Sequence, residues 1–290
     1  MAIKTIAVVL PTIRQETIPT FLQSWQPLFD KHNVEFIMVV DGEDQHIIHN
    51  HERVDLKSDL VSKFCAGSRQ LGFLYISQSL PDVEYIITLD DDETPIGDPI
   101  QDHINALNMK APISWMSTAN IHMRGFPYGV REEAEVMLSH GVWDGNPDYD
   151  APTQLLVPKD FVPTYYQGII PKGIFFPMCG MNLAFRRKAL PYVFFAPVGQ
   201  FKGAERWDDI YAGILLIPDF AKLNWGIVTG YARVLHTRAS NVFYNLEKEA
   251  VGLRHNEEFW KDPENYTGDA WFDDFRNKRQ AWYDLTKTHD

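Results

Sequence analysis

The sequence predicts a doubly wound α/β fold, in which helices flank the strands of a central sheet. Three short apolar runs, at residues 3–10, 34–40 and 85–89, are typical of buried strands. Segments with helical apolar spacing separate these runs, so strands and helices alternate along the first half of the chain. Carboxylates directly follow the second and third runs. They would lie at the edge where open α/β sheets bind ligands.

The first of these strands is residues 3–10, IKTIAVVL, which Pro11 ends. Thr12 and Arg14 come just beyond it, at the expected ligand edge. From residue 17 to residue 29 the apolar side chains recur on one face of a helix. This pair of elements begins the alternation.

The second strand, residues 34–40, ends at Asp41, which precedes a glycine. A carboxylate there is placed to hold a base or a ribose, although an ordinary turn explains this dipeptide equally well. Residues 43–57 are polar and rich in histidine without the spacing of a metalloprotease site, which indicates a surface loop. A helix over residues 58–78, carrying Arg69, then leads to the third strand.

The third strand, residues 85–89, stops at three consecutive aspartates, Asp90, Asp91 and Asp92, followed by Glu93. Clustered carboxylates repel one another unless a cation lies between them. Their hard oxygen atoms suit Mg²⁺ or Mn²⁺, and protein-bound ions of this kind are usually completed by substrate phosphates. A solvated acidic turn is the alternative interpretation.

Two familiar phosphate-binding motifs are missing from the sequence. It contains neither G-x-G-x-x-G nor G-x-x-x-x-G-K-[ST], so it does not predict dinucleotide or P-loop binding. A metal at the aspartates would then have to carry the phosphate charge. This combination is what an enzyme of nucleotide sugars needs.

The second half of the chain is less regular. Residues 98–109 predict a helix and residues 113–118 a strand. Residues 124–155 are rich in Gly, Pro and aromatic residues and are interpreted as a long functional loop. This segment carries several polar candidates for a site, namely Arg124, Arg131, His140, Trp143, Asp148 and Asp150.

Four further segments complete the chain. Residues 173–185 bring an apolar segment back to the sheet, with Asn182 as the lone polar side chain near its end. Residues 204–216 predict a helix, and residues 226–235 a late strand. The tail, residues 244–290, is charged and aromatic with helical spacing, and we assign it to packing or to an oligomer surface, without chemistry.

Composition limits the class of protein. The 290 residues are enough to bury a substantial core, and 45% of them are hydrophobic. The net charge of −12 argues against a broad nucleic-acid surface. Only two cysteines occur, which suits a reducing compartment. No apolar run is long enough to span a membrane. We therefore expect a soluble, cytoplasmic protein.

Several blocks of the sequence resemble the reversibly glycosylated polypeptides, the family of the UDP-arabinopyranose mutases. The resemblance follows chain order from residue 6 to about residue 250, and its two long central blocks are highly specific. The blocks are PTIR (11–14), DG (41–42), DDD (90–92), RGFPYGVRE (124–132), SHGVWDGNPDYDAPTQL (139–155), PKGIFFPMCGMNLAF (171–185), RWDDIYAG (206–213) and HTRASNVFYNLEKE (236–249).

This resemblance implies a GT-A-like nucleotide-sugar-binding fold, a mixed sheet flanked by helices, in one catalytic domain. Residues 1–118 would bind nucleotide and metal, residues 119–243 would bind sugar and catalyse, and residues 244–290 would form the helical tail. It also implies a Mn²⁺ or Mg²⁺ cofactor, no flavin, and interconversion of UDP-arabinopyranose with UDP-arabinofuranose. Reversible self-glycosylation on an arginine and assembly into homo- or hetero-oligomers are further implications.

In the matching blocks, Arg124 takes the place of the glycosylated arginine and Arg131 that of a second arginine needed for activity. Either residue could instead form a surface salt bridge or a phosphate clamp, and for Arg131 we prefer the clamp. A guanidinium that captures a sugar needs a carboxylate beside it to accept a proton. Asp208 and Asp209 are the candidates, with helix capping as the alternative.

The remaining site residues are expected to bind metal or substrate. His236, at the end of a late strand, is a candidate third metal ligand. The alternative is a buried histidine of the core. Asp148 and Asp150 would bind sugar hydroxyls or simply form a turn. The full set expected to contact the UDP-sugar is Thr12, Arg14, Asp41, Arg69, Trp143, Asp148, Asp150 and Asn182.

Two other functions use the same residues. An authentic glycosyltransferase would pass the sugar to a separate acceptor, with Arg124 serving only the phosphate. A self-glycosylated carrier would keep the sugar and show no multiple turnover. Product analysis without an acceptor separates these from a mutase, which equilibrates two UDP-sugars.

Overall fold

The fold is taken from a computed structural model that describes residues 5–116, 121–158, 161–199, 201–237, 240–268 and 271–287. Residues 3–4 of the first predicted strand and residues 117–118 of the strand predicted at 113–118 lie outside these ranges. Within them, no helix is both long and apolar enough to cross a membrane.

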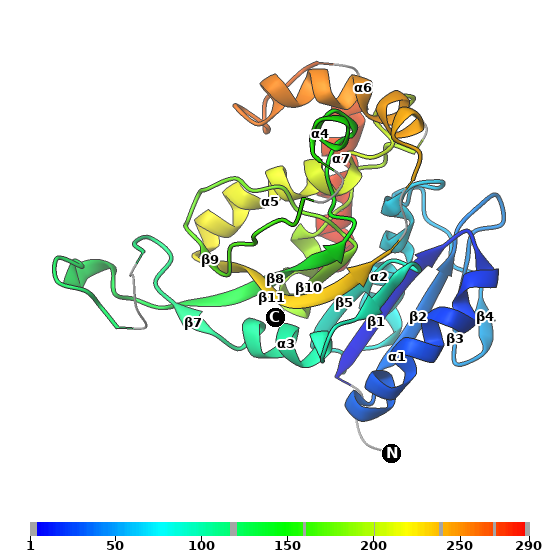
Figure 1. The fold of residues 1–290 in the computed structure, drawn as a ribbon, viewed down its shortest axis with the longest axis horizontal. Helices are drawn as coiled ribbons and strands as arrows, with labels where there is room; N and C mark the ends of the chain where they lie inside the picture. Colours follow the sequence, from blue (N-terminus) through cyan, green and yellow to red (C-terminus); the bar gives the residue numbers. More distant parts are fainter. Residues whose placement is uncertain are drawn as a thin grey trace.

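A mixed sheet runs through the centre of the molecule (Figure 1). In its first half β1 (Ile6–Thr12) lies between β2 (Glu35–Val40) and β5 (Tyr85–Leu89), and all three are parallel. The second half is mixed, because β10 (Asn182–Arg186) runs antiparallel to β5 and to β8 (Ala134–Gly145). The full strand order is β4-β3-β2-β1-β5-β10-β8-β11-β6. This confirms the predicted doubly wound α/β class.

Among the described residues, six further strands complete the sheet. They are β3 (His46–His49), β4 (Glu52–Val54), β6 (Glu93–Pro95), β7 (Lys110–Ala111), β9 (Gly168–Ile170) and β11 (Gly226–His236). β11 lies between β8, to which it is parallel, and the short β6. The carboxyl ends of β8 and β11 therefore meet the turn that follows the aspartates.

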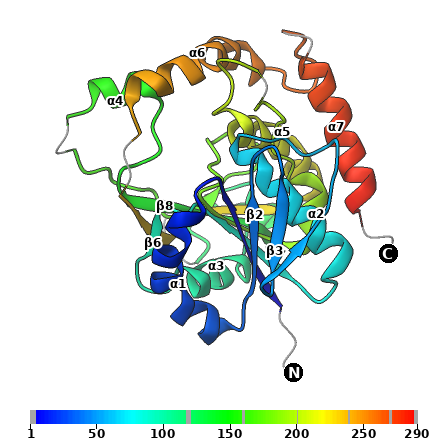
Figure 2. The same cartoon turned by 90° about the vertical axis from the view of Figure 1, so that its right-hand side faces the viewer.

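Helices cover both faces of the sheet (Figures 1 and 2). On one face lie α1 (Ile18–His32) and α3 (Pro99–Leu107), and on the other α2 (Gln70–Ser79), α5 (Asp208–Leu223) and α7 (Trp271–Thr286). The strands explain this, because successive side chains of a strand point to opposite faces. In β1, Ala7 and Val9 enter the core under α2, and Val8 and Leu10 enter the core under α1.

Two helices lie over the carboxyl edge of the sheet rather than on a face. They are α4 (Ala151–Leu156) and α6 (Val242–Phe259), which contact each other (Figure 1). The tail predicted at residues 244–290 is helical, as expected, and forms most of α6 and all of α7. Short 3-10 turns complete the fold at η1 (Gln15–Thr17), η2 (Ala66–Arg69), η3 (Tyr128–Val130) and η4 (Arg187–Tyr192).

Several predicted elements were wrong. The supposed surface loop at residues 43–57 contains the edge strands β3 and β4. The supposed functional loop at 124–155 contains the 12-residue strand β8, which is buried from Val136 to Trp143. Its run of buried residues lacks a strand's usual alternation because the sheet is covered on both faces. Residues 113–116 form no strand, and the helix predicted at 58–78 begins only at Gln70.

Candidate active site

A cleft of about 760 Å³ opens at the carboxyl edge of the sheet, below α4 and α6. Its floor comes from the ends of three strands. Asp90 and Asp92 follow β5, Gly145 ends β8, and His236 ends β11. β11 brings these segments together, because His236 pairs with Gly145 on one side and with Glu93 on the other. The predicted meeting of carboxylates at this edge is therefore observed.

The three aspartates do not act as one group. Asp91 is almost fully buried and forms an ion pair with Arg14, while the hydroxyl groups of Thr12 and Thr17 donate hydrogen bonds to it. Asp90 and Asp92 instead line the cleft. Asp91 and Asp92 lie in the turn between β5 and β6, where the backbone changes direction and the side chains separate. The structure therefore pairs Asp91 with Arg14 and gives no support to its predicted role as a metal ligand.

His236 faces Asp92 with the nitrogen atom that could bind a metal. Its Nδ1 lies 2.7 Å from the carbonyl oxygen of Asn146, which can only accept, so Nδ1 carries a proton. Its Nε2 lies 3.7 Å from an oxygen of Asp92. Both atoms are therefore placed to contact a cation between them.

The electrostatics of Asp92 also suit a cation. Burial raises the pKa of this carboxyl above its usual range, and the negative charge of Asp90 raises it further. A bound divalent cation would offset both effects. Among the described residues, no group of three His, Cys, Asp or Glu side chains is already arranged as a complete metal site. Asp90, Asp92 and His236 are the donors that this cleft offers to an ion that substrate oxygens complete.

A second pocket of about 480 Å³ adjoins the cleft at Asp90, which lines both. Thr12, Arg14, Asp41 and Arg69, all predicted to contact substrate, line this second pocket. Burial raises the pKa of Asp41, which accepts hydrogen bonds from the amide of Gly42 and the side chain of Gln45. The predicted substrate contacts of this second pocket therefore lie beside the predicted metal ligands of the cleft, and Asp90 borders both.

Arg69 acts as an internal brace. Its side chain is 1% exposed and donates to Asp90 at 2.8 Å, to the hydroxyl of Thr88 at 2.7 Å and to the carbonyl of Gly180. Because these groups belong to β5 and to the segment before β10, the guanidinium holds Asp90 at the junction of the two pockets.

Asp208 and Asp209 are buried beneath the site and do not line the cleft. Asp208 accepts a hydrogen bond from the amide of Gly67, and Asp209 accepts one at 3.0 Å from the amide of Gly180. They therefore join the start of α5 to η2, which contains Arg69, and to the segment before β10, which Arg69 also binds. The prediction that they assist an arginine in catalysis finds no support in this placement, because their oxygen atoms face buried backbone.

This buried pair predicts a falling stability with rising pH. Burial raises the pKa of Asp209 above its ordinary value of 3.8, and the charge of Asp208 raises it further. The folded protein therefore holds a proton that the unfolded chain releases, so the free energy of unfolding should fall as the pH rises above 3.8. Urea unfolding of the Asp209→Asn variant between pH 4.5 and 8.5 should show a shallower fall. An unchanged slope would contradict the assignment.

Three predicted substrate contacts are structural instead. Asn182 is fully buried, and its amide bonds to His103 and to the carbonyls of Val142 and Ala232. Trp143 is 6% exposed and packs in the core under α1 and α3. Asp150 caps α4 by accepting from the amide of Thr153 at 2.7 Å. The predictions for Asn182 and Trp143 failed because each side chain points into the covered sheet.

Asp148, predicted to bind sugar hydroxyls, lines the cleft opposite Arg206. A nitrogen of Arg206 lies 3.8 Å from Asp148, and its Nε donates to Glu249 of α6 at 2.8 Å. Glu249 also accepts from the amide of Ala151 at the start of α4. These contacts fix α4 and α6 to the edge of the cleft.

Arg124 and Arg131 lie outside the cleft. They belong to the segment that leads into β8, which we call the arm (residues 121–133) and which projects from the far end of the sheet (Figure 1). Gly145 lines the cleft at the other end of β8, and 12 strand residues span roughly 35–40 Å. Arg124 is exposed, and Arg131 stacks on the ring of Tyr128. Within one chain, the structure does not bring either arginine to the aspartates.

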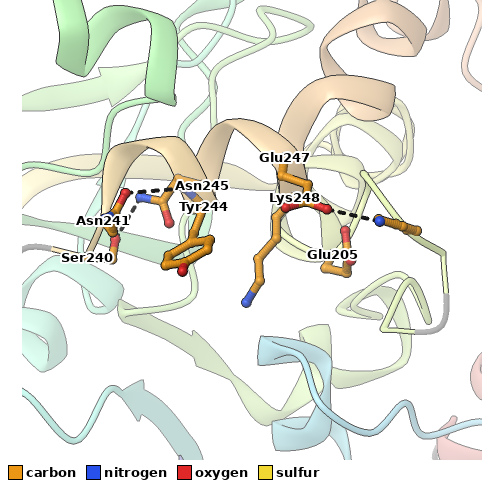
Figure 3. A pocket seen from close by; sticks show the side chains of 8 residues that line it. Glu205, Ser240, Asn241, Tyr244, Asn245, Glu247 and Lys248 are labelled. Carbon is orange, nitrogen blue, oxygen red and sulfur yellow. Dashed lines mark hydrogen bonds and ion pairs between the residues drawn. The ribbon is translucent and has the colours of Figure 1, made fainter.

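Sequence analysis missed the contribution of α6. Ser240, Asn245 and Lys248 line the cleft and also a neighbouring pocket of about 570 Å³ (Figure 3). The tail had been assigned no chemistry, although the block HTRASNVFYNLEKE already extended to residue 249. The resemblance in that block was the signal that could have indicated a functional role for the start of α6.

Comparison with known proteins gives matches over most of the chain. Residues 1–261 match the family model described as reversibly glycosylated polypeptide. UDP-arabinopyranose mutase 3 of Arabidopsis thaliana is 34% identical, and the match covers 88% of this chain and 75% of the relative. UDP-arabinopyranose mutase 1 of Oryza sativa subsp. japonica is 32% identical, covering 88% and 74%.

Solved structures also resemble the chain, at lower similarity. The catalytic domain of Drosophila beta1,4galactosyltransferase 7 in complex with xylobiose aligns with a TM-score of 0.41 at 11% identity, covering 91% of this chain and 82% of that one. A point mutant of that enzyme, in complex with manganese, UDP-Gal and xylobiose, aligns with a TM-score of 0.43 at 12% identity, with the same coverage of 91% and 82%.

Proposed function

This chain belongs to the reversibly glycosylated polypeptide family, and from that premise we propose that it interconverts UDP-arabinopyranose and UDP-arabinofuranose. Its named relatives are UDP-arabinopyranose mutases. We propose further that the reaction needs a divalent cation and no flavin, and that it proceeds with reversible glycosylation of Arg124.

The observation that carries the proposal is the pair of pockets that meet at Asp90. A UDP-sugar has a nucleoside, a diphosphate and a sugar in a row, and the two pockets with the carboxylates between them suit that order. The pocket beside β1 would take the nucleoside, with Asp41 on the base or ribose. The cleft would take the sugar, with Asp148 on its hydroxyl groups.

Asp90, Asp92 and His236 are the residues that would hold Mn²⁺ or Mg²⁺. Carboxylate oxygens suit both ions, the imidazole nitrogen suits Mn²⁺ better than the harder Mg²⁺, and either ion leaves positions for substrate oxygens. When bound, the ion would neutralise the diphosphate and so make UDP a better leaving group. Arg69 would keep Asp90 in place throughout.

Ring contraction requires C1 of the sugar to exchange O5 for O4. In the proposed reaction UDP leaves C1 with the bonding electrons, while a nitrogen of Arg124 gives its lone pair to C1 and its proton to a carboxylate. The nitrogen lone pair then expels O5, which takes up a proton, and an open iminium forms. The O4 hydroxyl adds to C1 and loses its proton. An oxygen of UDP finally attacks C1, and the arginine nitrogen leaves with the electrons of the C1–N bond and takes back a proton from the carboxylate.

The position of the arm determines how Arg124 could take part. One strand length separates the arm from the cleft of the same chain. We therefore propose that Arg124 enters the cleft of a second copy. The carboxylates that line that cleft, Asp148 among them, are then the groups that can accept the arginine's proton.

The first test is turnover without an acceptor. The wild-type protein, incubated with UDP-arabinofuranose and Mn²⁺, should convert it to a mixture containing UDP-arabinopyranose, as measured by chromatography of the nucleotide sugars. Intact mass should show a pentose adduct on the protein. A glycosyltransferase would release UDP by hydrolysis at most, and a carrier would stop after one equivalent. Either result would refute the mutase.

A further inference from the structure

Lys248 occupies a position that no other described cation shares. It lies in the second turn of α6 and lines the cleft, the nucleoside-side pocket and the pocket of Figure 3. Its long side chain reaches down from the helix, away from the ion pair between Glu247 and Lys202 (Figure 3). The ammonium group therefore borders the place where the two proposed substrate pockets meet.

The arginines around that junction are already engaged by carboxylates. Arg14 binds Asp91 and lies 3.2 Å from Asp92, Arg69 binds Asp90, and Arg206 binds Glu249. By contrast, Lys248 forms no ion pair or hydrogen bond with any residue in the described ranges. A new anion can thus bind Lys248 without displacing an acid.

The neighbouring amides of the helix offer no substitute. At the start of α6 the side chain of Asn241 accepts from the amides of Phe243 and Tyr244. With these donors occupied and Asp90, Asp92 and Asp148 lining the cleft, an anionic group needs cationic help to enter. Lysine is well suited, because its ammonium is a compact charge on a flexible stem.

We propose that Lys248 binds the diphosphate of the substrate, from the side opposite the aspartates. The inference rests on the proposed function, because it takes the ligand to be a nucleoside diphosphate sugar. Lys248 would hold the phosphates in the ground state and also accept the charge that develops on UDP as it leaves C1.

The fold holds α6 where this role requires it. Glu249, the next residue, is 3% exposed and anchors the helix to Arg206 and Ala151. One turn further on, Gly252 packs so closely on the indole of Trp207 that a Cβ atom there would lie 2.1 Å from the ring. The helix backbone is thereby fixed, and the flexible stem of Lys248 extends from it to line both proposed substrate pockets.

The test compares the binding of UDP and of uridine to Lys248→Met in the presence of Mn²⁺, by calorimetry. Loss of a charge-assisted contact should weaken UDP binding about 10- to 100-fold and leave uridine binding within twofold. Lys248→Arg, which keeps the charge, should recover most of the affinity. Lys202→Met is the matched control, because Lys202 lines only the pocket of Figure 3 and should leave both affinities unchanged.

Three results would overturn the inference. If Lys248→Met binds UDP as the wild type does, Lys248 is not a diphosphate ligand, and the proposed function stands. An equal loss of UDP and uridine affinity would indicate a structural role instead. If the wild type binds no UDP, the proposed function fails and the inference fails with it. Thermal melting of each variant checks that the fold is retained.

Discussion

Asparagine in place of Asp92 is expected to abolish Mn²⁺-dependent binding of UDP. Asp92 is the carboxylate that faces Nε2 of His236, so the substitution would remove a charged ligand from the proposed metal site. We expect the apparent affinity for UDP with Mn²⁺ to fall on the order of 100-fold or more. Mutase turnover should disappear with it.

The same substitution should not destabilise the metal-free protein. The pKa of Asp92 is raised by burial and by Asp90, so the charged form opposes folding, and a neutral amide relieves that cost. Mn²⁺ and UDP together should raise the melting temperature of the wild type and leave that of the variant unchanged. Calorimetry and thermal melting measure both effects.

A matched control is Asp150→Asn, a second isosteric change near the cleft. Asparagine caps helices as well as aspartate does, so α4 should persist, and Asp150 does not line the cleft. Its UDP affinity should equal that of the wild type. If Asp92→Asn retains full metal-dependent binding, the metal site is not at the end of β5.

A mixture of two inactive variants is expected to restore glycosylation of the protein. Asp92→Asn keeps Arg124 but should no longer bind substrate in its cleft. Arg124→Ala keeps a cleft that binds substrate but lacks the arginine that accepts the sugar. If the arm of one copy enters the cleft of another, a mixture incubated with UDP-arabinofuranose and Mn²⁺ should place the pentose on the Asp92→Asn chain. Intact mass identifies the modified chain, because the two variants differ in mass.

Each variant alone provides the control and should remain unmodified. Arg124→Ala should bind UDP with nearly wild-type affinity, because Arg124 is exposed on the arm and away from both pockets. If it instead loses UDP affinity, Arg124 is a phosphate clamp. If the wild type is modified but the mixture is not, the arginine works within its own chain and the arm must move.

The end of β5 shows how far sequence reasoning could reach. An apolar run followed by Asp90, Asp91 and Asp92 was sufficient to place a charged site at the edge of a sheet, and the structure has it there. The role of each carboxylate was not predictable from the run alone. Asp91 is the partner of Arg14, which lies beyond the end of the neighbouring strand β1, and only the folded sheet brings the two residues together.

Buried polar residues were the main source of error. Asn182, Asp208 and Asp209 all stand in blocks with a family resemblance, and each was assigned to substrate or catalysis. In the structure they satisfy backbone groups of distant segments, at Val142, Gly67 and Gly180 respectively. Their partners are 40, 141 and 29 positions away along the chain, so no local pattern could identify them.

Local chemistry therefore specified the α/β alternation and the acidic strand end, because both depend on residues close together in the chain. Family resemblance added the reaction to be tested. Which groups face a common cleft depended on strand order and on the packing of α6. That packing brought Lys248 over Asp90, although 158 positions separate them in the sequence. Residues far apart in the sequence become neighbours only when the strands pair and α4 and α6 pack over the edge of the sheet. That packing determines which charged side chains can contact one substrate.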